Sequence, residues 1–138
     1  MAVRWSEVVL DCIDPLRVAT FWSAVLGWPM RRFEEDGEVY YDLEPPTPGM
    51  PEMTFVPVSA PKSGKLRLHI DVRPTGGASQ AEEVERLTAL GATPADVGQG
   101  EVSWVVLADV EGNEFCVLVP DGAASRSASA LMRPRTSS

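Results

Sequence analysis

The sequence predicts an α+β fold in which two βαβββ modules form a curved mixed sheet around a concave cleft, with the helices on the convex side. An internal repeat is the main reason, because residues 3–58 and 65–119 each contain signals for a strand, a helix and three further strands. Both expected helices also end at a Leu-Gly pair, Leu26-Gly27 and Leu90-Gly91. The length of 138 residues suits one core, so we expect a single domain over residues 1–120.

The first module begins with an apolar, β-branched run over residues 3–12, which is typical of a strand. Asp14-Pro15 follows, and this pair suits the cap and first position of a helix that ends at Gly27. The spacing of the apolar residues predicts one buried stripe on this helix, formed by Val18, Phe21, Trp22, Val25 and Leu26.

A hairpin and a further strand are expected to complete the first module. Residues 28–33 and 38–43 flank a segment, residues 34–37, whose Asp-Gly pair is a strong turn signal. Residues 52–58 form the next strand-like run, inside a segment from 45 to 61 that holds six of the twelve prolines. Helices are excluded from that segment, so we expect stiff loops around the strand.

The second module opens with residues 65–73, where apolar and polar residues alternate with the period of a strand that has one packed face. Ser79 and Glu82 form a capping box for a helix that ends at Gly91. Further strands are predicted at residues 93–97, 102–108 and 114–119, with residues 109–113 as the last turn. The Ala/Ser/Arg-rich residues 121–138 are expected to form a flexible tail.

Composition excludes several classes of function. The formal charge of −8 disfavours nucleic acid and anionic membrane partners. One histidine and two cysteines exclude a multi-histidine zinc site and a disulfide framework. The sequence shows neither an export signal nor an apolar span, so we expect a soluble cytoplasmic protein in which Cys12 and Cys116 are free thiols.

The order of these elements resembles that of the vicinal oxygen chelate superfamily, which includes glyoxalase I, extradiol dioxygenases and bleomycin-resistance proteins. Asp14-Pro15, Leu26-Gly27 and the turn from Asp109 to Phe115 carry the resemblance, which covers residues 3–120. The run from Arg67 to Asp71 is similar to the small bacterial glyoxalase-like group. The resemblance implies a homodimer that binds a small molecule in its cleft.

The resemblance also implies four metal-ligand positions, which fall on Glu7, Val56, His69 and Cys116. Valine cannot ligate a metal, and the other three form a softer set that is better matched to Zn²⁺ than to harder ions. We therefore expect no cofactor and no complete metal site. The alternative is a divalent metal such as Zn²⁺ on Glu7, His69 and Cys116.

Three residues are candidates for chemistry in their own right. His69 alternates onto the polar face of the predicted strand with Arg67 and Asp71. It could therefore ligate a metal, act as a base or bind a ligand. The structural alternative is an imidazole that is hydrogen-bonded to Asp71 or Glu7. Glu7 lies between apolar neighbours, which suits a general base, although a solvated edge glutamate is equally consistent. Cys116 lies in an apolar run, which favours a core position over a nucleophile.

Two main functions follow from these residues. The first is small-molecule binding of the drug-resistance type, which the acidic composition and the valine among the ligand positions favour. The second is a glyoxalase-type lyase or isomerase, or a dioxygenase, that uses Glu7 and His69. A metal-independent epimerase or dehydratase is a third hypothesis.

The aromatic residues Trp28, Tyr40 and Tyr41 could also line a cleft for a small molecule. The residues expected to contact a ligand are Trp5, Val56, Arg67, Asp71, Trp104 and Cys116.

Overall fold

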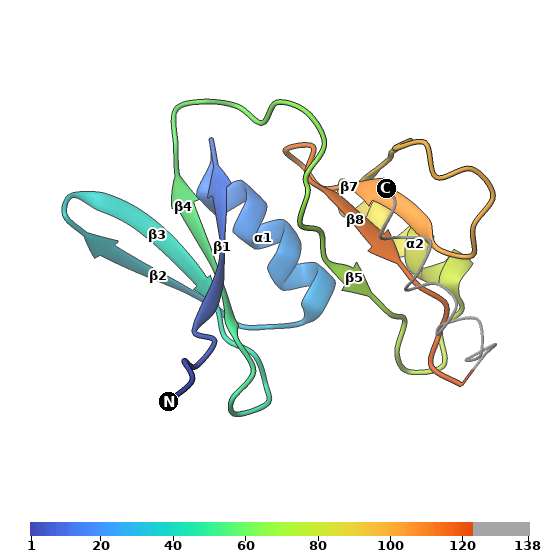
Figure 1. The fold of residues 1–138 in the computed structure, drawn as a ribbon, viewed down its shortest axis with the longest axis horizontal. Helices are drawn as coiled ribbons and strands as arrows, with labels where there is room; N and C mark the ends of the chain where they lie inside the picture. The colour runs from blue at the N-terminus through green and yellow to red at the C-terminus, as the bar shows by residue number, and fades with distance from the viewer. Residues whose placement is uncertain (123–138) are drawn as a thin grey trace. The chain divides into compact units, whose positions relative to one another are not determined.

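The computed structural model describes residues 1–122, which divide into two compact units. Unit 1 comprises Met1–Ser63, and unit 2 begins at Gly64. Each unit contains a four-stranded mixed sheet and a helix, so the predicted α+β class and the predicted repeat of modules are confirmed (Figure 1). The tail predicted over residues 121–138 lies, from residue 123 onward, outside the described residues.

Unit 1 follows the predicted order of strand, helix and three strands. Its sheet has the order β1-β4-β3-β2, in which β1 and β4 are parallel and the other neighbours are antiparallel. The elements of unit 1 are β1 (Glu7–Cys12), α1 (Pro15–Leu26), β2 (Met30–Glu35), β3 (Glu38–Leu43) and β4 (Glu52–Pro57).

Local chemistry explains the boundaries of these elements. The backbone N–H of Arg17 donates to Asp14 Oδ1 (3.2 Å), which caps α1, and Gly27 ends the helix in the left-handed conformation. Asp36 and Gly37 both have positive φ, at 53° and 78°, as a tight hairpin turn requires. Helix α1 covers one face of the sheet with Val18, Ala19, Phe21, Trp22 and Val25, all of them buried (Figure 1).

Unit 2 repeats this topology with shorter strands. Its sheet has the order β5-β8-β7-β6, and β5 is again parallel to its neighbour β8. The predicted capping box is formed, because Ser79 and Glu82 each accept a hydrogen bond from the other's backbone N–H. The elements of unit 2 are β5 (Asp71–Val72), α2 (Gln80–Ala89), β6 (Thr93–Pro94), β7 (Val105–Ala108) and β8 (Glu114–Val117).

The strand predicted over residues 65–73 is wrong in extent, because only Asp71 and Val72 pair as β5. The chain bends at Arg67 and Leu68, and Leu68 is 76% exposed instead of packed. The backbone N–H of Leu66 donates to a side-chain oxygen, Glu114 Oε1 (3.0 Å), and not to the backbone of a neighbouring strand. The strand predicted at residues 93–97 is likewise reduced to Thr93–Pro94.

Two further expectations concern the cysteines and membranes. Cys12 and Cys116 are both buried and form no disulfide, as predicted. Among residues 1–122, neither helix has the length and apolar character needed to cross a membrane.

Candidate functional site

Three side chains capable of binding a metal converge in unit 2. Asp71 pairs with Cys116 in the parallel ladder of β5 and β8, which places their side chains on the same side of the sheet. His69 lies two residues before Asp71, and the N–H of Cys116 donates to the carbonyl of Ile70 (3.0 Å), which fixes the segment between them. As a result, one potential ligand atom from each of His69, Asp71 and Cys116 lies within 4.8 Å of the others.

This group is largely buried. The side chains of His69 and Asp71 are 18% and 16% exposed, and Cys116 is 5% exposed. His69 Nδ1 lies 3.3 Å from Asp71 Oδ1, which is an ion-pair distance if the imidazole is protonated. The direction of this contact is not that of a hydrogen bond, and Nδ1 has no hydrogen-bond partner among residues 1–122. Asp71, one of the two carboxylates expected to hold His69, therefore lies within contact distance of Nδ1 without a hydrogen bond to it.

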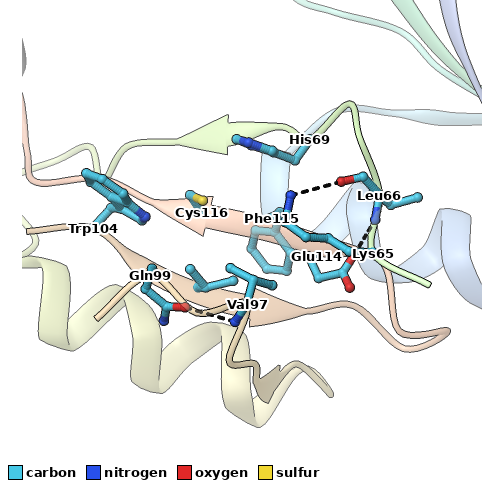
Figure 2. A pocket seen from close by; sticks show the side chains of 10 residues that line it. Lys65, Leu66, His69, Val97, Gln99, Trp104, Glu114, Phe115 and Cys116 are labelled. Carbon is cyan, nitrogen blue, oxygen red and sulfur yellow. Dashed lines mark hydrogen bonds between the residues drawn. The ribbon is translucent and has the colours of Figure 1, made fainter. Parts of the chain in front are cut away.

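His69 and Cys116 also line a pocket in unit 2 (Figure 2). The pocket has a volume of about 20 Å³, which is room for about one water molecule or one ion. Binding sites for drug-sized ligands measure roughly 300–1,000 Å³. This pocket taken alone therefore suits a single ion or one polar group of a larger molecule. Its other lining residues are Lys65, Leu66, Val97, Gln99, Trp104, Val106, Glu114 and Phe115.

Cys116 is both a core residue and a pocket residue. It packs with Trp104, Val106 and Leu118 in a buried cluster, as its apolar surroundings predicted. The turn before β8 sets its position, because the buried Asp109 Oδ1 accepts from the backbone N–H groups of Glu111 (2.9 Å) and Asn113 (3.0 Å). Trp104, expected to contact a ligand, lies in the wall of the same pocket.

Sequence reasoning missed Gln99 and Glu114 as pocket residues. The side chain of Gln99 accepts from the N–H of Val97 (2.9 Å), and Glu114 accepts from Leu66, so both hold loop backbone at the pocket. The bond between Glu114 and Leu66 joins residues 48 positions apart, and no local sequence signal indicates such a pairing. Arg67, expected to contact a ligand, lies exposed at the bend before His69.

The other predicted site residues belong to unit 1. Glu7 is exposed, and its carboxylate accepts from the hydroxyls of Ser6 (2.8 Å) and Thr54 (3.5 Å). Its neighbours Trp5 and Val9 are 68% and 51% exposed, so unit 1 does not enclose Glu7 in apolar groups. Val56 is paired with Asp11 and not with Glu7.

A polar chain crosses the sheet of unit 1 beside Glu7, and sequence reasoning did not anticipate it. The buried Asp42 accepts from the guanidinium of Arg31 and from the hydroxyl of Thr54 (2.8 Å). The hydrogen bond to Asp42 raises the pKa of Arg31 above its ordinary value. The alternation along each strand indicates which side chains share a face. The register of the strands, which pairs Arg31 with Asp42 and Asp42 with Thr54, is what brings these side chains together.

Comparison with known proteins supports the fold assignment. A family model for the glyoxalase-like domain matches residues 7–118. No curated protein matches this sequence. Among solved structures, the fosfomycin resistance protein FosX of Listeria monocytogenes, complexed with Mn(II) and sulfate, is 14% identical with a TM-score of 0.64. That comparison covers 91% of this chain and 99% of the FosX chain.

Two further solved structures have a similar fold. FosX from Mesorhizobium loti is 14% identical, with a TM-score of 0.62 over 93% of this chain and 99% of its own. A glyoxalase/bleomycin resistance protein/dioxygenase family enzyme from Burkholderia phytofirmans PsJN is 18% identical, with a TM-score of 0.53. It covers 83% of this chain and 97% of its own. At these identities the likeness establishes the fold alone.

Proposed function

The chain belongs to the family of glyoxalase-like domains, and from this premise we propose that it binds a small organic molecule. The solved structures of similar fold include fosfomycin resistance proteins, which supports this proposal. The pocket of unit 2 would hold one polar group of that molecule. The observation that carries this proposal is the buried Nδ1 of His69, which lacks a hydrogen-bond partner among the described residues and belongs to a side chain that lines the pocket. Buried polar atoms are nearly always paired, so a ligand group that reaches Nδ1 would gain a hydrogen bond.

The character of the pocket wall supports a ligand with an apolar body. Trp104, Phe115 and Leu66 contribute apolar surface, and His69 and Gln99 are among the few polar groups. Such a wall with a few convergent polar groups is the usual composition of small-molecule sites. The formal charge of −8 favours a neutral or cationic ligand over an anionic one.

A thermal-shift screen tests this proposal. The panel contains bleomycin and other cationic antibiotics together with fosfomycin as an anionic comparison. A ligand present at about 100 times its Kd stabilises the folded state by about 2.7 kcal/mol, which a rise in Tm reports. We expect Trp104→Leu and His69→Gln to reduce the shift, whereas Phe33→Leu, which changes an aromatic residue of the β2–β3 hairpin in unit 1, leaves it intact. The proposal fails if no compound raises Tm, or if the pocket variants respond as the native chain does.

A glyoxalase-type lyase or isomerase, or a dioxygenase, is the second candidate function. The grouping of His69, Asp71 and Cys116 favours it, because an imidazole beside a carboxylate can move a proton and the three together can bind a cation. FosX from Listeria monocytogenes was solved with Mn(II). Mn²⁺ prefers oxygen ligands, and a thiol in the set fits it poorly, so we derive no step through that ion.

Metal analysis of native protein, purified without chelator, tests the second candidate. We expect a stoichiometric divalent ion that is lost in His69→Ala. Metal-free native protein whose Tm is unaltered by added divalent ions would contradict a metal-dependent reaction and leave the ligand-binding proposal standing.

A further inference from the structure

We propose that β2 is an interaction surface for a second copy of this chain, and that two copies associate by pairing their β2 strands antiparallel. β2 is an edge strand, because β3 is its one neighbouring strand among residues 1–122 (Figure 1). The outer side of an edge strand presents main-chain groups that can pair with another strand. The family resemblance implies a homodimer without specifying a surface, and the pairing of β2 does not depend on a bound ligand.

The main chain of β2 presents alternate residues to the outside of the sheet. Glu35 and Glu38 are paired on either side of the tight turn that joins β2 to β3. The hydrogen-bonding groups of Glu35 therefore face β3, since a hydrogen-bonded pair closes a two-residue turn. Successive residues of a strand direct these groups to opposite sides, so the N–H and C=O groups of Arg32 and Glu34 face outward.

The charges of β2 have an order that is complementary to itself. Arg31 and Arg32 precede Phe33, and Glu34 and Glu35 follow it. All four charged residues are exposed. In an antiparallel pair centred on Phe33, each arginine of one copy lies opposite a glutamate of the other. Opposite charges in this position stabilise a strand pair, and like charges destabilise it.

Main chain and charge select the same register. With Phe33 opposite Phe33, Arg32 of one copy lies opposite Glu34 of the other, and both present their main-chain groups to each other. Sliding one strand by two residues preserves this phase but places Arg32 opposite Arg32 or Glu34 opposite Glu34. A parallel pair in register places every charge beside its like. The antiparallel pair centred on Phe33 therefore satisfies both requirements.

Phe33 supplies apolar contact at the centre of the pair. It is half-buried, and its ring lies edge-to-face with Tyr40 at a centroid distance of 5.3 Å. The two Phe33 residues would form a non-hydrogen-bonded pair, in which opposing side chains approach closely. Exposed ion pairs add little affinity. We therefore assign affinity to the main-chain hydrogen bonds and the two rings, and register to the charges.

The charges of β2 also have a simpler interpretation, because charged residues on an edge strand can prevent pairing. Arg32 Nη1 lies 3.0 Å from Glu34 Oε2 within the strand, which is consistent with that role. An edge of one charge repels every copy of itself, whereas the mirrored order in β2 leaves one register attractive. In that register Arg32 and Glu34 of both copies form a group of four alternating charges, so the salt bridge within each strand can persist.

Sedimentation equilibrium of the full chain tests the surface at protein concentrations up to about 1 mM, which populates even a weak dimer. We expect a reversible dimer, because an interface of one strand per copy is small. Arg32→Glu and Glu34→Arg each place like charges opposite one another twice, so each should weaken dimerisation at least about tenfold. An equimolar mixture of these two variants should form heterodimers, because every arginine then faces a glutamate again. Arg17→Glu makes the same charge change at an exposed position of α1 and should leave dimerisation unchanged.

Oxidative cross-linking tests the register. Phe33→Cys would place two thiols on directly opposite residues with Cα atoms about 4.5 Å apart, which a disulfide can bridge. Oxidised glutathione should therefore link Phe33→Cys into dimers, whereas the thiols of Glu35→Cys would lie more than about 13 Å apart and should not be linked. The buried Cys12 and Cys116 are present in both variants.

Four results would each overturn the proposal. These are a native chain that stays monomeric, a dimer that neither Arg32→Glu nor Glu34→Arg weakens, a mixture of the two that shows no recovery, and cross-linking of Glu35→Cys as readily as Phe33→Cys. Circular dichroism of each variant shows that loss of the dimer is not loss of the fold.

Discussion

The two units have the same strand order, but the parallel ladders at the edges of their sheets differ in length. In unit 1, β1 and β4 pair over six residues, from Glu7 with Glu52 to Cys12 with Pro57. In unit 2, β5 and β8 pair over two, Asp71 with Cys116 and Val72 with Val117. The bend that shortens β5 lies directly before His69. A repeated topology can therefore carry a continuous sheet in one copy and a candidate site in the other.

The two units also differ in how fully their buried polar side chains are hydrogen-bonded. In unit 1 the buried Asp42 is bound by both Arg31 and Thr54, which makes this chain of residues a structural feature. In unit 2, Nδ1 of His69 makes no hydrogen bond within residues 1–122, although it lies 3.3 Å from Asp71 Oδ1. Groups at functional sites are often incompletely satisfied until a ligand arrives, whereas structural polar groups are paired in the fold itself.

The largest expected effect distinguishes the two helices. Helix α1 buries five residues and α2 buries only Leu87, so unit 1 should depend more strongly on its helix. Trp22 is 2% exposed, and Trp22→Ala should lower the free energy of unfolding by about 3–5 kcal/mol. Val84 of α2 is only half-buried, and Val84→Ala should have a much smaller effect. Urea denaturation followed by circular dichroism measures both, and equal losses would contradict this difference between the units.

A smaller effect on stability should distinguish Asp42 of unit 1 from His69 of unit 2. Asp42→Ala removes the closer acceptor of the buried hydroxyl of Thr54, so it should destabilise the fold by about 1–3 kcal/mol. In metal-free protein His69→Gln should cost less than this, because Nδ1 of His69 makes no hydrogen bond within residues 1–122. Urea midpoints of the two variants provide the measurement. A larger loss in His69→Gln would mean that His69 is structural.

Much of the fold could be predicted because its signals are local. The Asp14 cap, the Gly27 stop, the Asp36-Gly37 turn and the Ser79 capping box each depend on a few neighbouring residues, and all are formed. The strand over residues 65–73 was wrong because its end depends on Glu114, which is distant in sequence. Alternation predicts which residues share a face but does not show where a side chain interrupts the ladder.

The candidate site was predictable in part for the same reason. His69 and Asp71 are two residues apart in the predicted alternation, which placed them on one face, although only Asp71 lies in β5. Cys116 was expected in the core, and it does lie there, but its pairing with Asp71 follows from the register of β5 and β8. The polar chain through Asp42 and Thr54 also depends on the register of β3 and β4, which could not be predicted from the sequence.

The smallest expected effect concerns the helix starts, which differ in chemistry between the units. Helix α2 begins with a capping box and with Glu82 and Glu83 in its first turn, whereas α1 has no acidic residue there. Ser79→Ala should destabilise unit 2 by about 1 kcal/mol. The hydrogen bonds with the backbone and side chain of Ser79 lower the pKa of Glu82 below 4.5.

A carboxyl group with a lowered pKa in the folded state stabilises the fold above its ordinary pKa, and this contribution is lost as pH falls through the lowered value. The urea midpoint of the native chain should therefore fall between about pH 5 and about pH 3 more than that of Glu82→Gln, which keeps a hydrogen-bonding side chain but cannot ionise. Arg17→Gln in the first turn of α1 serves as a control and should leave the acid dependence unchanged, because it does not alter the capping box. If Glu82→Gln has the same pH dependence as the native chain, the charge of Glu82 contributes nothing to the start of α2, and the two helix starts differ only in hydrogen bonding.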